Sequence, residues 1–288
     1  MSIFKKKNVE EGLIIQPKRN LLDVNLNELW NYRDLILLFV RRDFVAKYKQ
    51  TILGPLWFII QPLLTTLMFT VVFGRIAGLS SDGLPRMLFY LSGIVCWNYF
   101  SQSLILTSNT FTQNVQIFGK VYFPRLSIPV SAVISNLILF AVQFVLFLVV
   151  LLMFVFRGTL VSPNWELMWF LPLLIILLAG LALGFGIIIS SLTTKYRDLT
   201  HLVTFGVQLW MYATPVIYPL SEIKHEKYRL LILSNPVSSL VEAFRNMMMG
   251  VGIFEWKYLF YSIGFCLGIM TVGVLLFNKI EQNFMDTV

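Results

Sequence analysis

Hydrophobic residues along this chain gather into six long runs that contain no Asp, Glu, Lys or Arg. These runs are residues 55–74, 87–119, 126–156, 167–194, 199–221 and 258–278. A helix needs about 20 apolar residues to cross the hydrocarbon core of a membrane, whereas barrel strands show about 10 residues that alternate apolar and polar. Since the runs do not alternate, they predict six spanning helices, at about 55–76, 87–108, 128–156, 168–192, 199–219 and 258–278.

The segment before the first run has a different pattern, with five charged residues between positions 41 and 49 and apolar residues at helical spacing. The apolar positions that fall on one helical face are Leu37, Val40, Phe44 and Tyr48. Gly54-Pro55 then breaks the helix before the first run. We therefore expect an amphipathic helix in the membrane interface, followed by a sharp turn into the first span. Such a helix is either a lipid anchor or a docking surface for a cytoplasmic partner, and the pattern leaves both open.

The longest segment between runs, residues 222–257, contains an apolar stretch that is too short to cross a membrane. Asn235 before Pro236 predicts the start of a helix, and Gly250 predicts its end. We expect short re-entrant helices here, on the periplasmic side and before the last span.

Composition supports a membrane protein, because 57% of the residues are hydrophobic and 13% are charged. Soluble domains have about 45–50% apolar and about 25% charged residues. The expected fold is an all-α integral membrane protein with a cytoplasmic N-terminal segment (1–54), a six-helix permease domain (55–280) and a cytoplasmic tail (281–288). An even number of spans places both termini on one side. That side holds fifteen of the 23 Lys and Arg residues, which favours the cytoplasm, although near the membrane the balance narrows to nine against eight.

The sequence lacks the groups that catalysis or ATP binding would need. It has no GxxxxGK[ST] motif, and the six runs contain no Asp, Glu, Lys or Arg. His201 and His225 fall at opposite membrane edges, and we interpret Cys96 and Cys266 as small buried residues. We therefore predict no catalytic site, no metal site and no cofactor in this chain. The net charge of +8 indicates contact with membrane lipids rather than nucleic acid.

Four motifs resemble the membrane subunits of bacterial ABC polysaccharide exporters, the type-2 ABC permease family. They are "RRDFVAKYKQTILGPLWFIIQPLLTTLMFTVVFGRIAGL", "KVYFPRLSIPVSAVIS", "TKYRD", and "QLWMYATPVIYP" followed by "NPVSSLVEAFR". The resemblance covers residues 28 to 280 in the same order. It implies a homodimer that works with two copies of a separate ATPase, which would bind ATP and Mg.

The resemblance also implies which residues transmit motion from the ATPase. They lie in the interface helix and in two short inner loops, at residues 119–129 and 193–199. By themselves these loops are equally ordinary positive-inside loops. The residues that we assign to coupling are Arg41, Arg42, Asp43, Tyr48, Lys49, Lys120, Tyr122, Phe123, Arg125, Lys195, Tyr196, Arg197 and Asp198.

The cargo that the resemblance implies is an undecaprenyl-type lipid-linked glycan, moved across the bacterial inner membrane. Aromatic rings and neutral amides or hydroxyls suit a sugar path, because their contacts are weak and repeated. The candidate channel residues are Gln61, Thr65, Trp97, Asn98, Tyr99, Gln102, Thr204, Gln208 and Tyr212. Each is alternatively an interhelical hydrogen-bonding residue or a member of an interfacial aromatic belt.

O-antigen is the favoured cargo, with teichoic acid and capsular polysaccharide as alternatives. A small-molecule or lipid exporter, a membrane-embedded glycolipid enzyme and a passive scaffold or channel also stay open.

Overall fold

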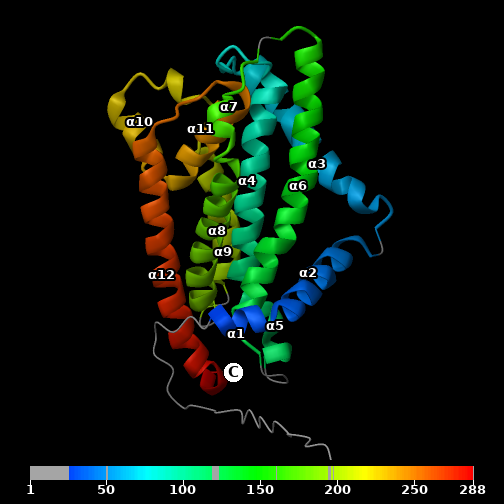
Figure 1. The fold of residues 1–288 in the computed structure, drawn as a ribbon, viewed down its shortest axis with the longest axis vertical. Coiled ribbons are helices and arrows are strands. Elements are labelled where there is room, and N and C mark those ends of the chain that lie inside the picture. Colours follow the sequence, from blue (N-terminus) through cyan, green and yellow to red (C-terminus); the bar gives the residue numbers. More distant parts are fainter. Residues whose placement is uncertain are drawn as a thin grey trace, which may run out of the picture.

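The computed structural model describes residues 26–49, 51–118, 123–159, 161–193, 196 and 198–287, and within them it contains helices and no strands. The longer helices run side by side, and α1 and α2 lie across one end of the bundle (Figure 1). The elements are α1 (Leu26–Asn31), α2 (Arg33–Tyr48), η1 (Gly54–Leu56), α3 (Trp57–Phe69), η2 (Thr70–Ile76), α4 (Arg86–Ser108), α5 (Thr110–Phe118), α6 (Ser127–Phe156), α7 (Trp165–Met168), α8 (Leu171–Thr193), α9 (Leu199–Tyr212), η3 (Leu220–Glu222), α10 (Glu226–Leu233), α11 (Pro236–Met249) and α12 (Trp256–Thr287).

Within the described residues, four helical segments are long and apolar enough to cross a membrane. They are Gly54–Ile76, Ser127–Phe156, Leu171–Thr193 and Trp256–Lys279. The all-helical prediction is confirmed, whereas the count of six spans stays a prediction. The predicted second span falls on α4, and α9, on the predicted fifth span, has 14 residues and ends at Tyr212. The chain turns after Tyr212, ahead of Pro215 and Pro219, which cannot extend a helix.

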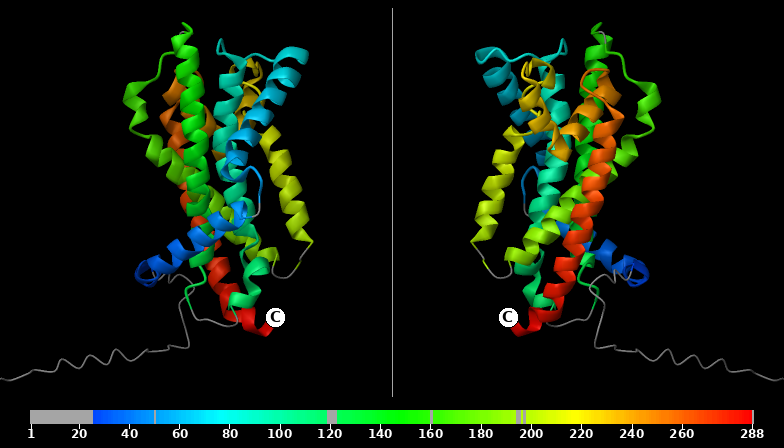
Figure 2. Two further views of the ribbon diagram at one scale, coloured as in Figure 1. Left: turned by 90° about the vertical axis from the view of Figure 1, so that its right-hand side faces the viewer. Right: turned by 90° about the vertical axis from the view of Figure 1, so that its left-hand side faces the viewer.

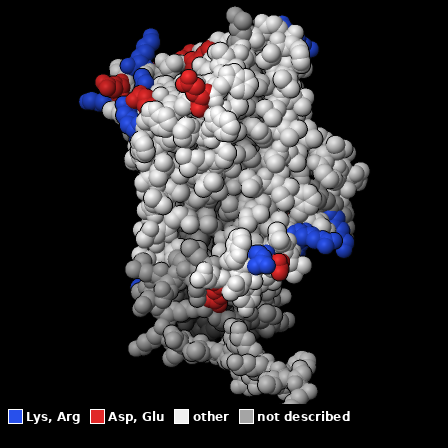
Figure 3. Space-filling view, in the orientation of Figure 1, with Lys and Arg blue, Asp and Glu red and all other residues white. Residues whose placement is uncertain are grey.

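Charged side chains separate into two zones on the face drawn in Figure 3. One zone lies near α10 and the other near α2, and the broad band between them carries none of the coloured residues. A protein surface that contacts the hydrocarbon core of a membrane has this distribution, because exposed charge there is costly.

The predicted break before the first span is confirmed, although the helix already ends ahead of Gly54-Pro55, which opens the next helical segment. Helix α2 ends at Tyr48, and Gly54 adopts a φ of +48°, a left-handed conformation that suits glycine. The expected apolar face of α2 is only partly correct. The helix packs against α6 and buries Ile36, Phe39 and Val40, while Leu37 is 60% exposed.

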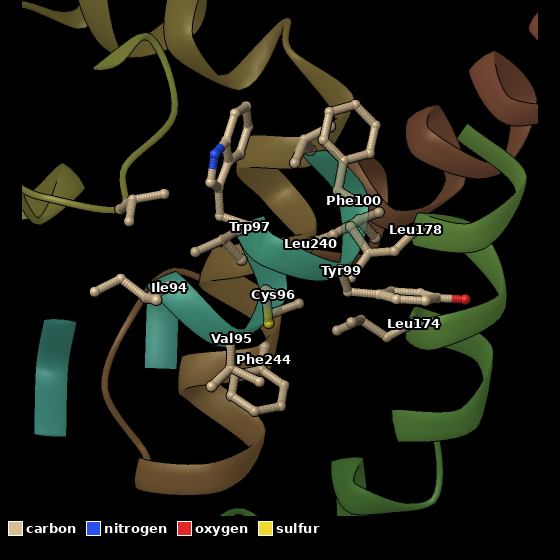
Figure 4. Packing of buried hydrophobic residues seen from close by; sticks show 14 of the residues in the cluster. Ile94, Val95, Cys96, Trp97, Tyr99, Phe100, Leu174, Leu178, Leu240 and Phe244 are labelled. Carbon is tan, nitrogen blue, oxygen red and sulfur yellow. The ribbon is translucent and has the colours of Figure 1, made fainter. Parts of the chain in front are cut away.

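Helix α4 lies in the centre of the bundle and packs against α3, α6, α8, α9 and α11. In Figure 4 its side chains, Trp97 and Phe100 among them, lie in one cluster with Leu178 of α8 and Phe244 of α11. Two glycines of α8 allow close approach on either side. A Cβ on Gly184 would meet Ile269 of α12, and one on Gly186 would lie 2.5 Å from the Thr107 Cβ of α4.

Helix α11 is buried almost completely, although it is not one of the four long apolar segments. The Asn235 side chain caps it by accepting a hydrogen bond from the Val237 backbone N–H at 3.1 Å, and Gly250 ends it at a φ of +70°. The helix predicted between these two residues is therefore confirmed. Whether α10 and α11 re-enter the membrane stays a prediction.

A buried ion pair lies within α11, and its arginine also contacts the neighbouring segments. The Arg245 guanidinium lies 2.9 Å from a Glu242 carboxylate oxygen, and at most 2% of either side chain is exposed. Arg245 also donates to the backbone carbonyls of Pro215 at 2.5 Å and Val216 at 2.9 Å, in the turn after α9. Its guanidinium carbon lies 3.8 Å from the Phe89 ring centroid of α4. One side chain thus connects α11, α4 and the turn after α9.

We predict that Arg245→Met destabilises the fold by about 3–5 kcal/mol, because it leaves Glu242 buried without its partner. The double variant Glu242→Gln/Arg245→Met recovers part of that loss, because no unpaired charge is left buried. The recovery is incomplete because the Pro215 and Val216 carbonyls remain unpaired. The measurement is the free energy of unfolding in detergent micelles titrated with dodecyl sulfate. Lys257→Met, which removes an exposed ion pair with Glu255, serves as the control and changes little. Equal effects of Arg245→Met and Lys257→Met would contradict the prediction.

We also predict that Gly184→Ala costs about 1–3 kcal/mol, because its methyl group would overpack the contact between α8 and α12. The added carbon would lie 3.2 Å from the Ile269 backbone carbonyl carbon. Gly264→Ala in α12 is the matched control, since its Cβ meets nothing within 4 Å, and it stabilises by about 0.5–1 kcal/mol. The measurement is the temperature at which each of the two variants loses its monodisperse fraction in detergent. A Gly184→Ala variant as stable as the wild type would contradict the prediction, because it would show that the contact between α8 and α12 accommodates the methyl group.

Candidate functional site

Five phenylalanines form a cluster at the end of the bundle where α2 lies, and we call them the inner aromatic cluster. They are Phe39 of α2, Phe111 and Phe118 of α5, Phe123 before α6, and Phe277 of α12. Phe123 lies 5.7 Å from both Phe39 and Phe118 between ring centroids, and Phe111 lies 4.9 Å from Phe277. Aromatic pairs at these distances add to the energy of burial. The cluster therefore ties α2 to α5, to the segment before α6 and to α12.

Two arginines cover this cluster from outside. The Arg42 guanidinium carbon lies 4.8 Å from the Phe39 ring centroid, and its Nη2 atom lies 2.8 Å from an Asp43 carboxylate oxygen. The Arg125 guanidinium carbon lies 5.6 Å from the Phe118 ring centroid. Both contacts are cation–π geometries, so these side chains are held in place rather than extended freely into solvent.

Among the described coupling residues, the structure separates one buried residue from several exposed ones. Phe123 is buried in the inner aromatic cluster with 5% of its area exposed. Arg41, Lys49, Tyr196 and Asp198 are exposed. The side chains of Tyr48, Lys120, Tyr122, Lys195 and Arg197 lie outside the described residues. The contact of these four exposed residues with an ATPase stays a prediction.

The predicted channel residues of α3 and α9 are mostly exposed. On α9, Gln208 and Tyr212 project from the protomer, and the Thr204 hydroxyl donates to the Thr200 carbonyl at 3.0 Å. On α3, Gln61 is exposed and its carbonyl accepts from the Thr65 hydroxyl at 3.0 Å. Both helices pack against α4. Figure 2 shows α9 close to the bundle at its last residues and well away from it at its first residues.

The predicted channel residues of α4 lie inside the protomer instead. Trp97 is 4% exposed and packs against Phe100 and Trp210, with ring centroids 5.5 and 6.5 Å away. Tyr99 is 3% exposed and packs on Phe140 of α6 at 5.2 Å.

A small polar pocket lies beside Tyr99, between α4 and α6. The Asn98 amide donates to Gln143 Oε1 at 3.2 Å, and Gln102 and Asn136 line the same pocket. This arrangement is the interhelical alternative that the sequence left open, and a channel role for these residues stays a prediction.

Sequence reasoning missed four residues that the structure brings into prominence. Asn136 and Gln143 are amides seven residues apart with only apolar residues between them, a spacing that places them on one helical face. That spacing was a usable signal for a polar contact inside the bundle. Glu242 and Arg245, three residues apart, gave a similar signal, but they fell in the short helix expected on the periplasmic side, where no buried ion pair was predicted. Among the described residues, no group of three or more His, Cys, Asp or Glu side chains could hold a metal ion.

Comparison with known proteins gives matches of two kinds, one to a family model and the others to individual proteins. The family model described as ABC-2 type transporter matches residues 34–249. The O-antigen export system permease protein RfbA of Klebsiella pneumoniae is 31% identical over 255 residues, which cover 88% of this chain and 94% of that protein.

Two further relatives have similar lengths. The protein of the same name from Myxococcus xanthus is 31% identical over 221 residues, 76% of this chain and 82% of its own. The polysialic acid transport protein KpsM of Escherichia coli is 23% identical over 248 residues, 85% of this chain and 93% of its own. Because the family model spans most of the chain, including α2, α11 and the helices between them, this protein belongs to the ABC-2 type transporter family.

Proposed function

We propose that this chain is the membrane subunit of an ATP-driven exporter that moves lipid-linked O-antigen polysaccharide across the bacterial inner membrane. The observation that carries this proposal is the similarity to O-antigen export permeases over 88% of the chain. Permeases of this family are transport subunits, so ATP binding and hydrolysis belong to a separate ATPase. The four long apolar segments support a membrane location.

The geometry supports six spans with both termini in the cytoplasm. Helix α4 has 23 residues, about 35 Å at 1.5 Å per residue, which exceeds the ~30 Å hydrocarbon core. Helix α9 is shorter, and the turn from Ala213 to Tyr218 extends its path. The first described helix and the end of α12 lie at the same end of the bundle (Figure 1), as an even number of spans requires.

A homodimer gives the exposed polar residues of α3 and α9 a role. The exposed amides of Gln61 and Gln208 are costly to place against hydrocarbon, so we infer that a second copy or a water-filled path covers them. Two copies that face each other through these helices would place Gln61, Thr65, Thr204, Gln208 and Tyr212 along a shared channel. Neutral groups and aromatic rings there offer the glycan weak, repeated contacts.

The end of the bundle with the inner aromatic cluster is the docking surface that we assign to the two ATPase copies. Exposed Arg41, Lys49, Tyr196 and Asp198 are available at this end for contact. Motion of α2 would pass through Gly54-Pro55 into α3, and through the inner aromatic cluster into α5 and α12.

Gln208→Trp should obstruct the channel and lower the amount of glycan at the cell surface about tenfold. Leu202→Trp, on another face of α9 and also exposed, is the matched control and should export normally. Quantitative staining of surface polysaccharide measures both. Normal export by Gln208→Trp would remove α9 from the channel.

Replacement of Tyr196, Arg197 and Asp198 by Ala should leave ATP hydrolysis by the assembled complex in place while glycan export falls about tenfold, because the contact that transmits motion is lost. Lys224→Ala at the opposite end is the control. ATPase activity and export are measured on the same membranes. Unchanged export by the triple variant would exclude these residues from coupling.

Capsular polysaccharide is a second candidate cargo, favoured by the similarity to the polysialic acid transport protein. Affinity purification of the tagged chain from its native membrane, followed by mass spectrometry, identifies the partner ATPase and any bound glycan. An ATPase with O-antigen glycolipid supports the first proposal, and one with a capsular glycolipid supports the second. Recovery of the chain with neither would contradict both.

A further inference from the structure

A wide apolar groove lies between α9 and the helices behind it. Its volume is about 570 Å³, within the ~300–1,000 Å³ of ligand pockets in proteins. No charged or amide side chain lines it. The lining residues are Leu104 of α4, Ile189 of α8, Val203, Gly206, Val207, Leu209 and Trp210 of α9, and Ala213 directly after it.

The groove and the polar residues of α9 lie on opposite sides of that helix. At 3.6 residues per turn, Thr204, Gln208 and Tyr212 follow one stripe along the helix. The six groove-lining positions from Val203 to Ala213 are centred about half a turn around the helix axis from the centre of that stripe. The groove therefore does not face the channel that the stripe would line. This step alone rests on the proposed function.

The groove cannot remain empty or fill with water at low cost. An empty space removes the dispersion contacts of the side chains that line it. Buried water needs two to four polar partners, and the lining side chains offer carbon atoms and one indole ring. Helix α8, which forms one wall, is long and apolar enough to span the membrane, so hydrocarbon is the medium at hand.

We propose that an acyl chain of a bilayer phospholipid occupies this groove and fills the space between α9 and the wall formed by α4 and α8. The absence of charged side chains from the lining means that the site holds the hydrocarbon chain and does not select a headgroup. Gly206 contributes to the groove because a Cβ at that position would meet no heavy atom within 4 Å. The lipid chain then supports α9 along a face where protein contacts are few.

The first test measures which medium fills the groove. The full-length chain with Gly206→Cys carries a nitroxide spin label in vesicles of dioleoylphosphatidylcholine that contain no glycan. Collision rates with oxygen, which dissolves in hydrocarbon, and with a water-soluble nickel chelate are compared. We expect frequent oxygen collisions and few nickel collisions. The wild-type chain, whose Cys96 and Cys266 are buried, gives the background labelling.

Two results of this test would overturn the proposal. Frequent nickel collisions at Gly206→Cys would show a groove filled with water, and few collisions of either kind would show a groove filled by protein. The same label at Gln208→Cys reports on the channel separately. A label there that collides with oxygen alone would contradict the channel and leave the lipid site standing.

The second test asks whether a phospholipid is retained in the groove. Gly206→Phe fills the space with a side chain, and Gly264→Phe, on an exposed part of α12 with nothing within 4 Å of its Cβ, is the matched control. Native mass spectrometry counts the phospholipids that remain on the purified chain. We expect Gly206→Phe to lose one phospholipid per chain and Gly264→Phe to lose none. An unchanged count for Gly206→Phe would overturn the proposal.

Discussion

Burial of the Arg245 guanidinium imposes the strongest constraint on this structure. A buried cation is tolerated only where acceptors surround it, and here the acceptors come from three parts of the chain. Glu242 contributes a carboxylate from the same helix, Pro215 and Val216 contribute carbonyls after α9, and Ser92 of α4 accepts at 3.3 Å. A shift of α4 or of the turn after α9 would remove hydrogen bonds from the buried guanidinium. The end of α9 at Tyr212 is therefore held, while its first residues stand away from the bundle (Figure 2).

The two ends of α9 thus differ in how they are held. Its first residues stand away from the bundle, and the hydrogen bonds of Arg245 keep the opposite end in register with α4 and α11. The polar pocket between α4 and α6 has a similar fixing effect inside the protomer, because the hydrogen bond between Asn98 and Gln143 joins two long helices in an apolar environment.

Much of the fold followed from local patterns in the sequence. Charge-free runs located the long helices, Gly54-Pro55 located the break after α2, and Asn235 with Gly250 marked both ends of α11. These features depend on neighbouring residues alone. The burial of Glu242 and Arg245 did not follow, because their partners at Pro215, Val216 and Ile253 are set by tertiary packing. The same limit applies to Phe123, which a loop motif suggested as a surface residue and which packing places inside a cluster.

The position of α11 also has a consequence for the order in which the chain assembles. The helix packs against α4 and α8, which are synthesised before it, and against α12, which is synthesised after it. Its Ser239 hydroxyl lies 2.7 Å from the Ser262 hydroxyl of α12. With a carboxylate and a guanidinium in its sequence, α11 is a poor substrate for insertion into lipid as a separate segment. Because α12 supplies part of its surroundings, α11 completes its packing only after the ribosome has synthesised α12, which makes this a late step of biogenesis.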